Sequence, residues 1–350
     1  MRRRRAQVTH HFNTPLLHYS LASYFPISTA CGACSPRGMT PVLSRRRFLH
    51  TAALASGAAA LAPVSLRAVE PFPRQGPPRL QLSLAAYSFR KYLPASIKAN
   101  DFAPGGRKFD LFQFLDYCAE HGVAGAELTS YYFPKDVDAD FLLRLRRHAF
   151  LRGVDISGTA VGNTFTLPPG GKRDAEIALV KKWTDHAAVL GAPHIRVFAG
   201  NVPKGSTKED AKKRSIEALE ECADYSGQKG IFLGIENHGG IVGEAADLID
   251  IIKSVKSPWV GINLDSGNFH TEDPYADFAR CAPWAVNVQM KGEIRRRDAK
   301  KSEPADLPRH VKALRDAGYQ GYVALEYESE EDPFTAIPPL LKTMRELFRS

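Results

Sequence analysis

Residues 230–268 read GIFLGIENHGGIVGEAADLIDIIKSVKSPWVGINLDSGN. Two short apolar runs, 231–236 and 260–265, flank an amphipathic stretch at 245–255, and each run ends in an acid, Glu236 or Asp265. A strand, a helix and a second strand in this order form a βαβ unit with parallel strands. Because parallel strands have their carboxyl ends on the same side, the two acids are predicted to lie on one face of the fold.

The same alternation continues on both sides of this unit. It predicts strands at 82–87, 125–128, 155–161, 194–199, 231–236, 260–265, 286–290 and 322–326, and helices at 111–121, 141–152, 175–190, 208–228, 245–255, 275–281, 307–317 and 334–348. Eight such pairs predict a single-domain α/β fold, the (β/α)8 TIM barrel. An open doubly wound sheet is the alternative, but it favours a glycine-rich turn after the first strand, and residues 85–89 read AAYSF.

The charge of the chain is concentrated at its N-terminus. The 350 residues carry a formal net charge of +9, and nine of the 47 Lys and Arg residues lie in residues 1–68, which contain no acid. Residues 69–350 therefore hold 38 basic and 38 acidic residues. This balance argues against nucleic-acid binding, which needs a basic face. A hydrophobic content of 44% also excludes the disordered class.

The N-terminal segment has the pattern of an export signal. Residues 44–50 read SRRRFLH, and an apolar run at 51–64 follows, with a small residue, Ala68, beyond it. This order predicts a twin-arginine signal peptide within a leader at 1–68, cleaved after Ala68, and a periplasmic mature protein. Translation from Met39 is an open alternative. The run is too short for a stable membrane span. A Pro-rich linker is predicted at 69–80 and the barrel at 81–350.

Oxygen-bearing side chains stand at the ends of four consecutive predicted strands. Glu236, Asp265, Gln289 and Glu326 are separated by 29, 24 and 37 residues, each close to one βα unit. Three carboxylates at one point repel one another unless a cation lies between them. Oxygen ligands suit one hard or borderline divalent ion, Mn²⁺, Mg²⁺ or Co²⁺, with Zn²⁺ left open. For each acid alone, an ion pair with an Arg or Lys is the alternative interpretation.

Several runs around these residues resemble a known family. The Glu, Asp, Gln, Glu order, ENHGG at 236–240, DSGN at 265–268 and GYQGYVALEYE at 318–328 resemble the xylose isomerase-like barrel superfamily. The closer resemblance is to proteins called sugar phosphate isomerase/epimerase, over about residues 80–350. Ketose 3-epimerases of this group have a His where this chain has Gln289. A Gln at this position is similar to inosose dehydratase-like members.

The resemblance implies a metal-dependent sugar isomerase or epimerase. Glu236 and Glu326 would then remove and return a proton beside a carbonyl through an enediolate, and the metal would be bound by Glu236, Asp265, Gln289 and Glu326. Six further residues are candidates for contact with the substrate, and for each the alternative role is an ion pair, packing or capping. They are Glu127, His238, Lys291, Arg196, Asn268 and His270.

Other functions stay open on the same site. A lyase or dehydratase acting on a 3-keto-glycoside or keto-inositol needs the same acidified C–H bond, and a non-catalytic sugar-binding barrel needs none of the proton chemistry. The expected partner is a small carbohydrate. No glycine cluster at a predicted helix start forms a convincing phosphate site, so "phosphate" is not carried over from the family name. The sequence leaves homo-oligomer formation open.

Overall fold

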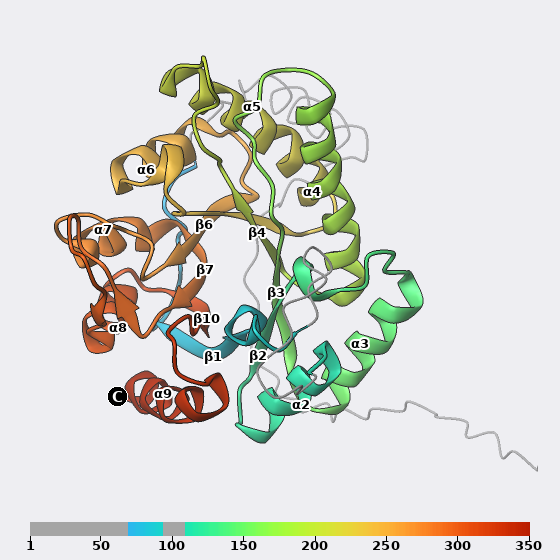
Figure 1. Ribbon diagram of the computed structural model, residues 1–350, viewed down its shortest axis with the longest axis vertical. Helices are drawn as coiled ribbons and strands as arrows, with labels where there is room; N and C mark the ends of the chain where they lie inside the picture. The colour runs from blue at the N-terminus through green and yellow to red at the C-terminus, as the bar shows by residue number, and fades with distance from the viewer. Residues whose placement is uncertain (1–68, 94–108) are drawn as a thin grey trace, which may run out of the picture. The chain divides into compact units, whose positions relative to one another are not determined.

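A computed structural model describes residues 69–93 and 109–350 of the chain. The predicted twin-arginine leader, Met39 and the cleavage site after Ala68 lie outside these residues. Within them, eight parallel strands close into a barrel in the order β1-β10-β7-β6-β5-β4-β3-β2. Helices surround it, and Figure 1 shows them around the strands. The predicted (β/α)8 barrel is therefore confirmed.

The barrel strands lie close to their predicted ranges. They are β1 (Arg79–Ala85), β2 (Gly125–Thr129), β3 (Asp155–Ala160), β4 (His194–Phe198), β5 (Phe232–Glu236), β6 (Val260–Asp265), β7 (Ala285–Met290) and β10 (Gln320–Leu325). β1 begins earlier than expected because Arg79 pairs with Gln320 of β10. It ends earlier because Ala86–Phe89 turns into the short 3-10 helix η2.

The outer helices also follow the predicted ranges. They are α2 (Leu111–Glu120), α3 (Ala139–Leu151), α4 (Gly171–Leu190), α5 (Lys208–Gly227), α6 (Ala245–Ser254), α7 (Pro274–Cys281), α8 (Leu307–Asp316) and α9 (Pro333–Arg349). Side chains of Asp110, Asp138 and Thr207 accept hydrogen bonds from the first turns of α2, α3 and α5, as N-caps do. Three short 3-10 helices also lie between these elements, at Ser130–Tyr132, Gly240–Val242 and Ala282–Trp284.

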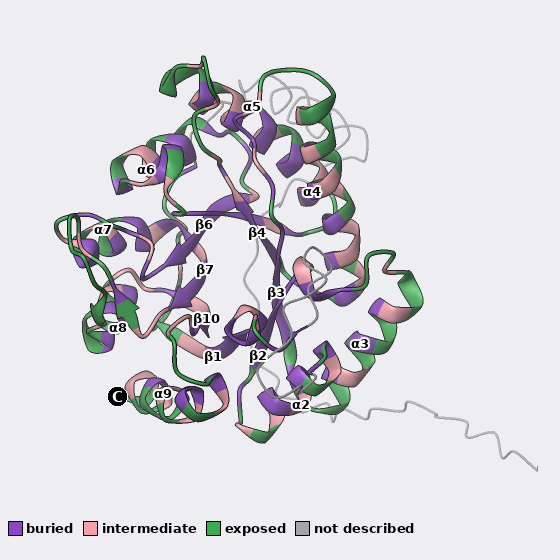
Figure 2. Cartoon of the chain, in the orientation of Figure 1, coloured by how far each residue is buried: buried purple, intermediate pink, exposed green. Residues whose placement is uncertain are grey.

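Burial follows this arrangement. The strands are almost entirely buried, and the helices alternate buried and exposed positions, so that each presents an apolar face to the strands (Figure 2). No helix among the described residues is both long and apolar enough to cross a bilayer. A two-stranded antiparallel sheet, β8 (Glu293–Ile294) with β9 (Glu303–Pro304), was not expected from the sequence.

The extended linker was predicted at 69–80, but Arg79 and Leu80 belong to β1, and residues 69–78 precede β1 and contact the barrel. The carbonyl of Val69 accepts a hydrogen bond from Trp284 Nε1 at 3.1 Å. The amide of Phe72 donates to Pro283 O at 3.2 Å, and the guanidinium of Arg74 lies 5.0 Å from the centre of the Tyr319 ring. These contacts hold the segment against the residues just before β7 and β10.

Candidate active site at the carboxyl end of the barrel

Strand register brings the predicted residues to one end of the barrel. Asp265, the last residue of β6, pairs in register with Gln289 of β7. Glu236 ends β5, and Glu326 directly follows β10. Side chains alternate between the two faces of a strand, so residues two apart, such as Asn263 and Asp265, share the interior face. Glu236, Asp265, Gln289 and Glu326 are all buried.

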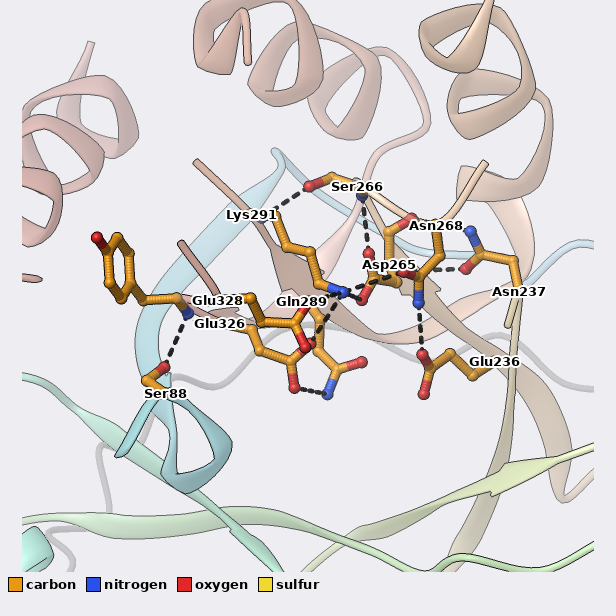
Figure 3. Close-up of polar contacts among 12 residues, drawn as sticks. Ser88, Glu236, Asn237, Asp265, Ser266, Asn268, Gln289, Lys291, Glu326 and Glu328 are labelled. Atoms are coloured by element: carbon orange, nitrogen blue, oxygen red, sulfur yellow. Dashed lines mark hydrogen bonds and ion pairs between the residues drawn. The ribbon is translucent and has the colours of Figure 1, made fainter. Parts of the chain in front are cut away.

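Lys291 is the centre of the contacts between these residues (Figure 3). Its Nζ lies 3.1 Å from Asp265 Oδ2, 3.5 Å from Glu326 Oε2 and 2.6 Å from Glu328 Oε2. It also donates to Asn268 Oδ1 at 3.0 Å. One ammonium group therefore links three carboxylates that come from β6 and from the end of β10.

Glu236 is held by separate partners. Arg196 of β4 places its Nε 3.0 Å from Glu236 Oε2. Asn268 donates to Glu236 Oε1 at 2.7 Å, so Asn268 connects Glu236 to Lys291. The guanidinium of Arg196 lies 4.0 Å from the centre of the Phe198 ring, a cation–π contact. Both oxygens of this buried carboxylate are thus occupied.

A second polar group lies deeper in the barrel. Gln289 Nε2 donates to Glu127 Oε1 at 2.7 Å and to Glu326 Oε1 at 3.3 Å. Asn263 Nδ2 donates to Gln289 Oε1 at 2.6 Å, and Asn287 Nδ2 donates to both Glu127 Oε2 and Asn263 Oδ1 at 2.7 Å. The carbonyl oxygen of Gln289 is thus turned toward Asn263.

The site carries an excess of negative charge. Glu127, Glu236, Asp265, Glu326 and Glu328 surround Arg196 and Lys291, which gives a formal charge of −3 when all seven are ionised. Burial raises the pKa of Glu127 and of Glu236 to about 7. Burial also raises the pKa of Glu326 well above its usual value, and the charges of Asp265 and Glu328 add to this. Burial lowers the pKa of Lys291, but the surrounding carboxylates more than offset it, so the amine stays protonated.

The carboxylates of the site suit a divalent cation in donor chemistry and in charge, but in this structure they are not gathered around one point. Asp265 Oδ2 is buried and accepts no hydrogen bond within the described part of the chain. Its contact is the ion pair with Lys291. Among residues 69–93 and 109–350, no group of three or more His, Cys, Asp or Glu side chains is arranged closely enough to hold a metal ion. The Lys291 ammonium supplies the positive charge between Asp265 and Glu326 in this structure.

Comparison with known proteins agrees with the barrel. The family profile described as Xylose isomerase-like TIM barrel matches residues 115–348. The chain belongs to this family. The resemblance expected from the runs at 236–240, 265–268 and 318–328 is therefore confirmed at the level of the family.

Relatives of the chain among the xylose isomerase-like TIM barrels include isomerases and epimerases. The chain is 22% identical over 249 residues to the 2-oxo-tetronate isomerase of Haemophilus influenzae, covering 65% of this chain and 93% of that protein. The crystal structure of IOLI protein with a bound zinc atom superposes with a TM-score of 0.60 at 18% identity, covering 76% of this chain and 96% of that one. D-psicose 3-epimerase, solved in the presence of D-fructose, gives 0.58 at 17%, covering 77% and 94%.

The remaining predicted substrate residues occupy different positions in this xylose isomerase-like barrel. Glu127, Arg196, Asn268 and Lys291 belong to the buried polar contacts described above. His238 is exposed in the loop after β5, with its ring 4.5 Å from that of Phe198. His270 is exposed in the loop after β6, 3.2 Å from Arg295 Nη2 through its Nδ1. Both histidines are thus peripheral to the carboxylate cluster.

Sequence reasoning missed three residues of the site. Glu328 makes the shortest of the three carboxylate contacts with Lys291, and Asn263 and Asn287 orient Gln289 and Glu127. Asn263 and Asn287 each stand two residues before a predicted site residue, Asp265 or Gln289, and this spacing would have placed them on the same interior face of the strand. Glu328 follows Glu326 by two residues, the period of a strand, which was the available signal.

Proposed function

We propose that the chain is a sugar isomerase or epimerase that moves a proton beside a carbonyl group, assisted by a divalent cation. One observation carries the proposal. Two buried glutamates, Glu236 and Glu326, enter the site from β5 and β10, which are separated by β6 and β7 in the closed barrel. Two carboxylates that approach from separate strands can serve as proton acceptor and donor for one bound substrate.

Different partners hold each glutamate. Arg196 and Asn268 fix Glu236, while Gln289 and Lys291 contact Glu326. Each carboxylate is thereby oriented by its own partners, and the contact between Asn268 and Lys291 connects the two sets. The Lys291 ammonium, at 3.1 Å from Asp265, is positioned to stabilise negative charge that develops on a substrate oxygen in an enediolate.

The proposed cation would be held by Glu236, Asp265 and Glu326. The fourth ligand predicted from the sequence was Gln289. When bound, it would polarise a carbonyl oxygen and make the neighbouring C–H bond more acidic. Mn²⁺, Mg²⁺ and Co²⁺ are the proposed ions, and the zinc in the IOLI structure keeps Zn²⁺ among them.

The substrate proposed is a small hydroxy-carbonyl sugar or sugar acid. The 2-oxo-tetronate isomerase and the D-psicose 3-epimerase are named for substrates of this kind, with a carbonyl beside a carbon that bears a hydroxyl group. Isomerisation, epimerisation and β-elimination share the loss of the same proton, so a lyase or dehydratase acting on a 3-keto-glycoside or keto-inositol is the second candidate. Gln289, which resembles the dehydratase-like members, favours that candidate.

Incubation with substrates in D₂O tests these proposals. Protein supplied with MnCl₂ is mixed with keto-sugars, 2-oxo sugar acids and 3-keto-glycosides, and the products are followed by NMR and mass spectrometry. Deuterium beside the carbonyl without bond cleavage supports the isomerase or epimerase, and a released aglycone or lost water supports the lyase. Binding of these ligands without any exchange of solvent deuterium would overturn both and favour the sugar-binding barrel.

Export remains a separate proposal that rests on residues 44–68 of the sequence. A fusion of residues 1–80 to a reporter is expected to reach the periplasm of a bacterium with a twin-arginine pathway. Replacement of Arg45 and Arg46 by Lys is expected to retain the reporter in the cytoplasm. Equal export of both fusions would contradict the proposal.

A further inference from the structure

The polar group in the barrel interior forms a closed ring of four side chains. Going around it, Glu127 accepts from Gln289, Gln289 accepts from Asn263, Asn263 accepts from Asn287, and Asn287 donates to Glu127. The four donor–acceptor distances lie between 2.6 and 2.7 Å. All four residues are buried.

Strand irregularities build this ring. The pairing of β6 with β7 shifts between Ile262 and Asn263, which sets Asn263 opposite Asn287. The pairing of β2 with β3 shifts between Ala126 and Glu127. Bulges of this kind re-aim side chains near active sites. The ring spans the barrel interior, because β2 and β7 are separated by β1 and β10 in the closed order.

The hydrogen bonds around the ring admit one orientation of the amides. An ionised Glu127 only accepts, so Gln289 and Asn287 must both turn their nitrogens toward it. The Asn287 nitrogen also faces Asn263 Oδ1. The nitrogen of Asn263 therefore faces Gln289, whose carbonyl oxygen must accept. The orientation of the Gln289 amide thus follows from these contacts, taken one after another around the ring.

Protonation of Glu127 does not permit the reverse arrangement. If its single proton bonded to a Gln289 carbonyl, the nitrogen of Gln289 would face Asn263, and both asparagines would have to turn over. The oxygen of Asn287 would then face Glu127 Oε2 at 2.7 Å with no proton between them. Such a contact between two acceptors is unfavourable. The ring thus keeps the amide of Gln289 fixed in either state of Glu127.

We propose that Gln289 is a positioning residue that donates hydrogen bonds to Glu127 and Glu326, and that its carbonyl oxygen is not a cation ligand. Its Nε2 uses both N–H groups, one on Glu127 at 2.7 Å and one on Glu326 at 3.3 Å. Its Oε1 is engaged by Asn263. An effect of Gln289 on catalysis depends on the proposed function of Glu326, whereas the role of Gln289 as a hydrogen-bond donor does not.

Thermal unfolding of two variants in EDTA tests the donor role without any metal. Gln289→Met removes the donor without adding charge, and Gln289→Glu adds a carboxylate that faces Glu127 and Glu326, with Arg196 and Lys291 as the nearby cations. At pH 5 we expect the Tm of Gln289→Glu to lie closest to that of the wild type, because a protonated carboxyl group can still donate one of the two hydrogen bonds. At pH 8 we expect its Tm to fall about 5 °C or more below that of Gln289→Met, because ionised carboxylates repel.

If the Tm of Gln289→Glu matched that of the wild type from pH 5 to pH 8, the donor role would be overturned. A carboxylate, which only accepts hydrogen bonds, would then have replaced the amide without loss of stability. Wild-type crystals grown with MnCl₂ give a second measurement that needs no variant. We expect Gln289 Oε1 to keep its hydrogen bond from Asn263 Nδ2. A distance of about 2.2 Å between Gln289 Oε1 and manganese would overturn the inference. If no manganese binds, the cation of the proposed function fails, while the unfolding data still decide the role of Gln289.

Discussion

Arg196 and Glu236 form a buried ion pair on neighbouring strands. Arg196 Nε lies 3.0 Å from Glu236 Oε2, with 6% and 4% of the two side chains exposed. Removing one partner from such a pair leaves an uncompensated charge in a medium that solvates it poorly. The pair therefore ties the stability of the barrel to a residue of the proposed proton-transfer site.

Arg196→Met is expected to lower the free energy of unfolding by about 3–5 kcal/mol, measured by urea denaturation at pH 8, where Glu236 is ionised. Arg144→Met is the matched control, because Arg144 pairs with Asp140 on the exposed surface of α3, and its expected cost is about 0–1 kcal/mol. Equal losses in the two variants would contradict the importance of the buried pair.

Glu326→Gln is expected to reduce turnover by about 10²–10⁴-fold, because the variant keeps the shape of the side chain but has no carboxylate to exchange a proton. Turnover is measured on whichever substrate shows deuterium exchange, and circular dichroism confirms the fold. Glu330→Gln serves as the control, since Glu330 is fully exposed and pairs with Lys91 at 3.5 Å. Unchanged turnover in Glu326→Gln would remove Glu326 from the mechanism.

Removal of divalent ions is expected to lower the stability of the protein. At a Mn²⁺ concentration about 100 times the Kd, binding adds roughly 2.7 kcal/mol, which corresponds to a Tm increase of about 5–10 °C over the EDTA-treated protein. Asp265→Asn is expected to abolish this increase, because Asp265 Oδ2 is a buried carboxylate oxygen that accepts no hydrogen bond within the described residues. Asp316→Asn, on the exposed end of α8, is expected to keep it. The same increase in both variants would place the ion elsewhere.

Acid is expected to destabilise the fold through buried histidines. Burial lowers the pKa of His310 to about 4, and its ring packs against Tyr275 and Phe278 at 4.6 and 4.7 Å. The unfolded chain has a His pKa near 6.5, so between these two pKa values it binds more protons than the folded chain. The free energy of unfolding is therefore unaffected by His310 above about pH 6.5 and falls as the pH drops toward 4. We expect the titration of His310 to lower the free energy of unfolding by about 3 kcal/mol over this pH range.

His310→Phe is expected to flatten this part of the curve of unfolding free energy against pH, because the aromatic ring remains and the titrating group is lost. His194, with its pKa also lowered to about 4 by burial, accounts for the dependence that persists in the variant. Curves for wild type and His310→Phe that run parallel between pH 4 and pH 7 would show that His310 does not contribute.

The local pattern of the chain was enough to predict the barrel strands and outer helices within the described residues, because apolar periodicity and helix ends are short-range properties. β1 shows the limit of that reasoning. Its start at Arg79 depends on pairing with Gln320, which lies far along the chain. The ends of strands are set by such partners, whereas the existence of the strands is not.

By itself, the sequence determined that oxygen-bearing side chains end four consecutive strands, because a barrel of parallel strands gathers their carboxyl ends on one side. The tertiary structure decided how those side chains meet. Lys291 lies among Asp265, Glu326 and Glu328, and a ring through Asn263 and Asn287 turns the amide of Gln289 toward Glu127. These contacts depend on register shifts between strands and on hydrogen bonds across the barrel interior, and neither is a property of any single segment of the chain.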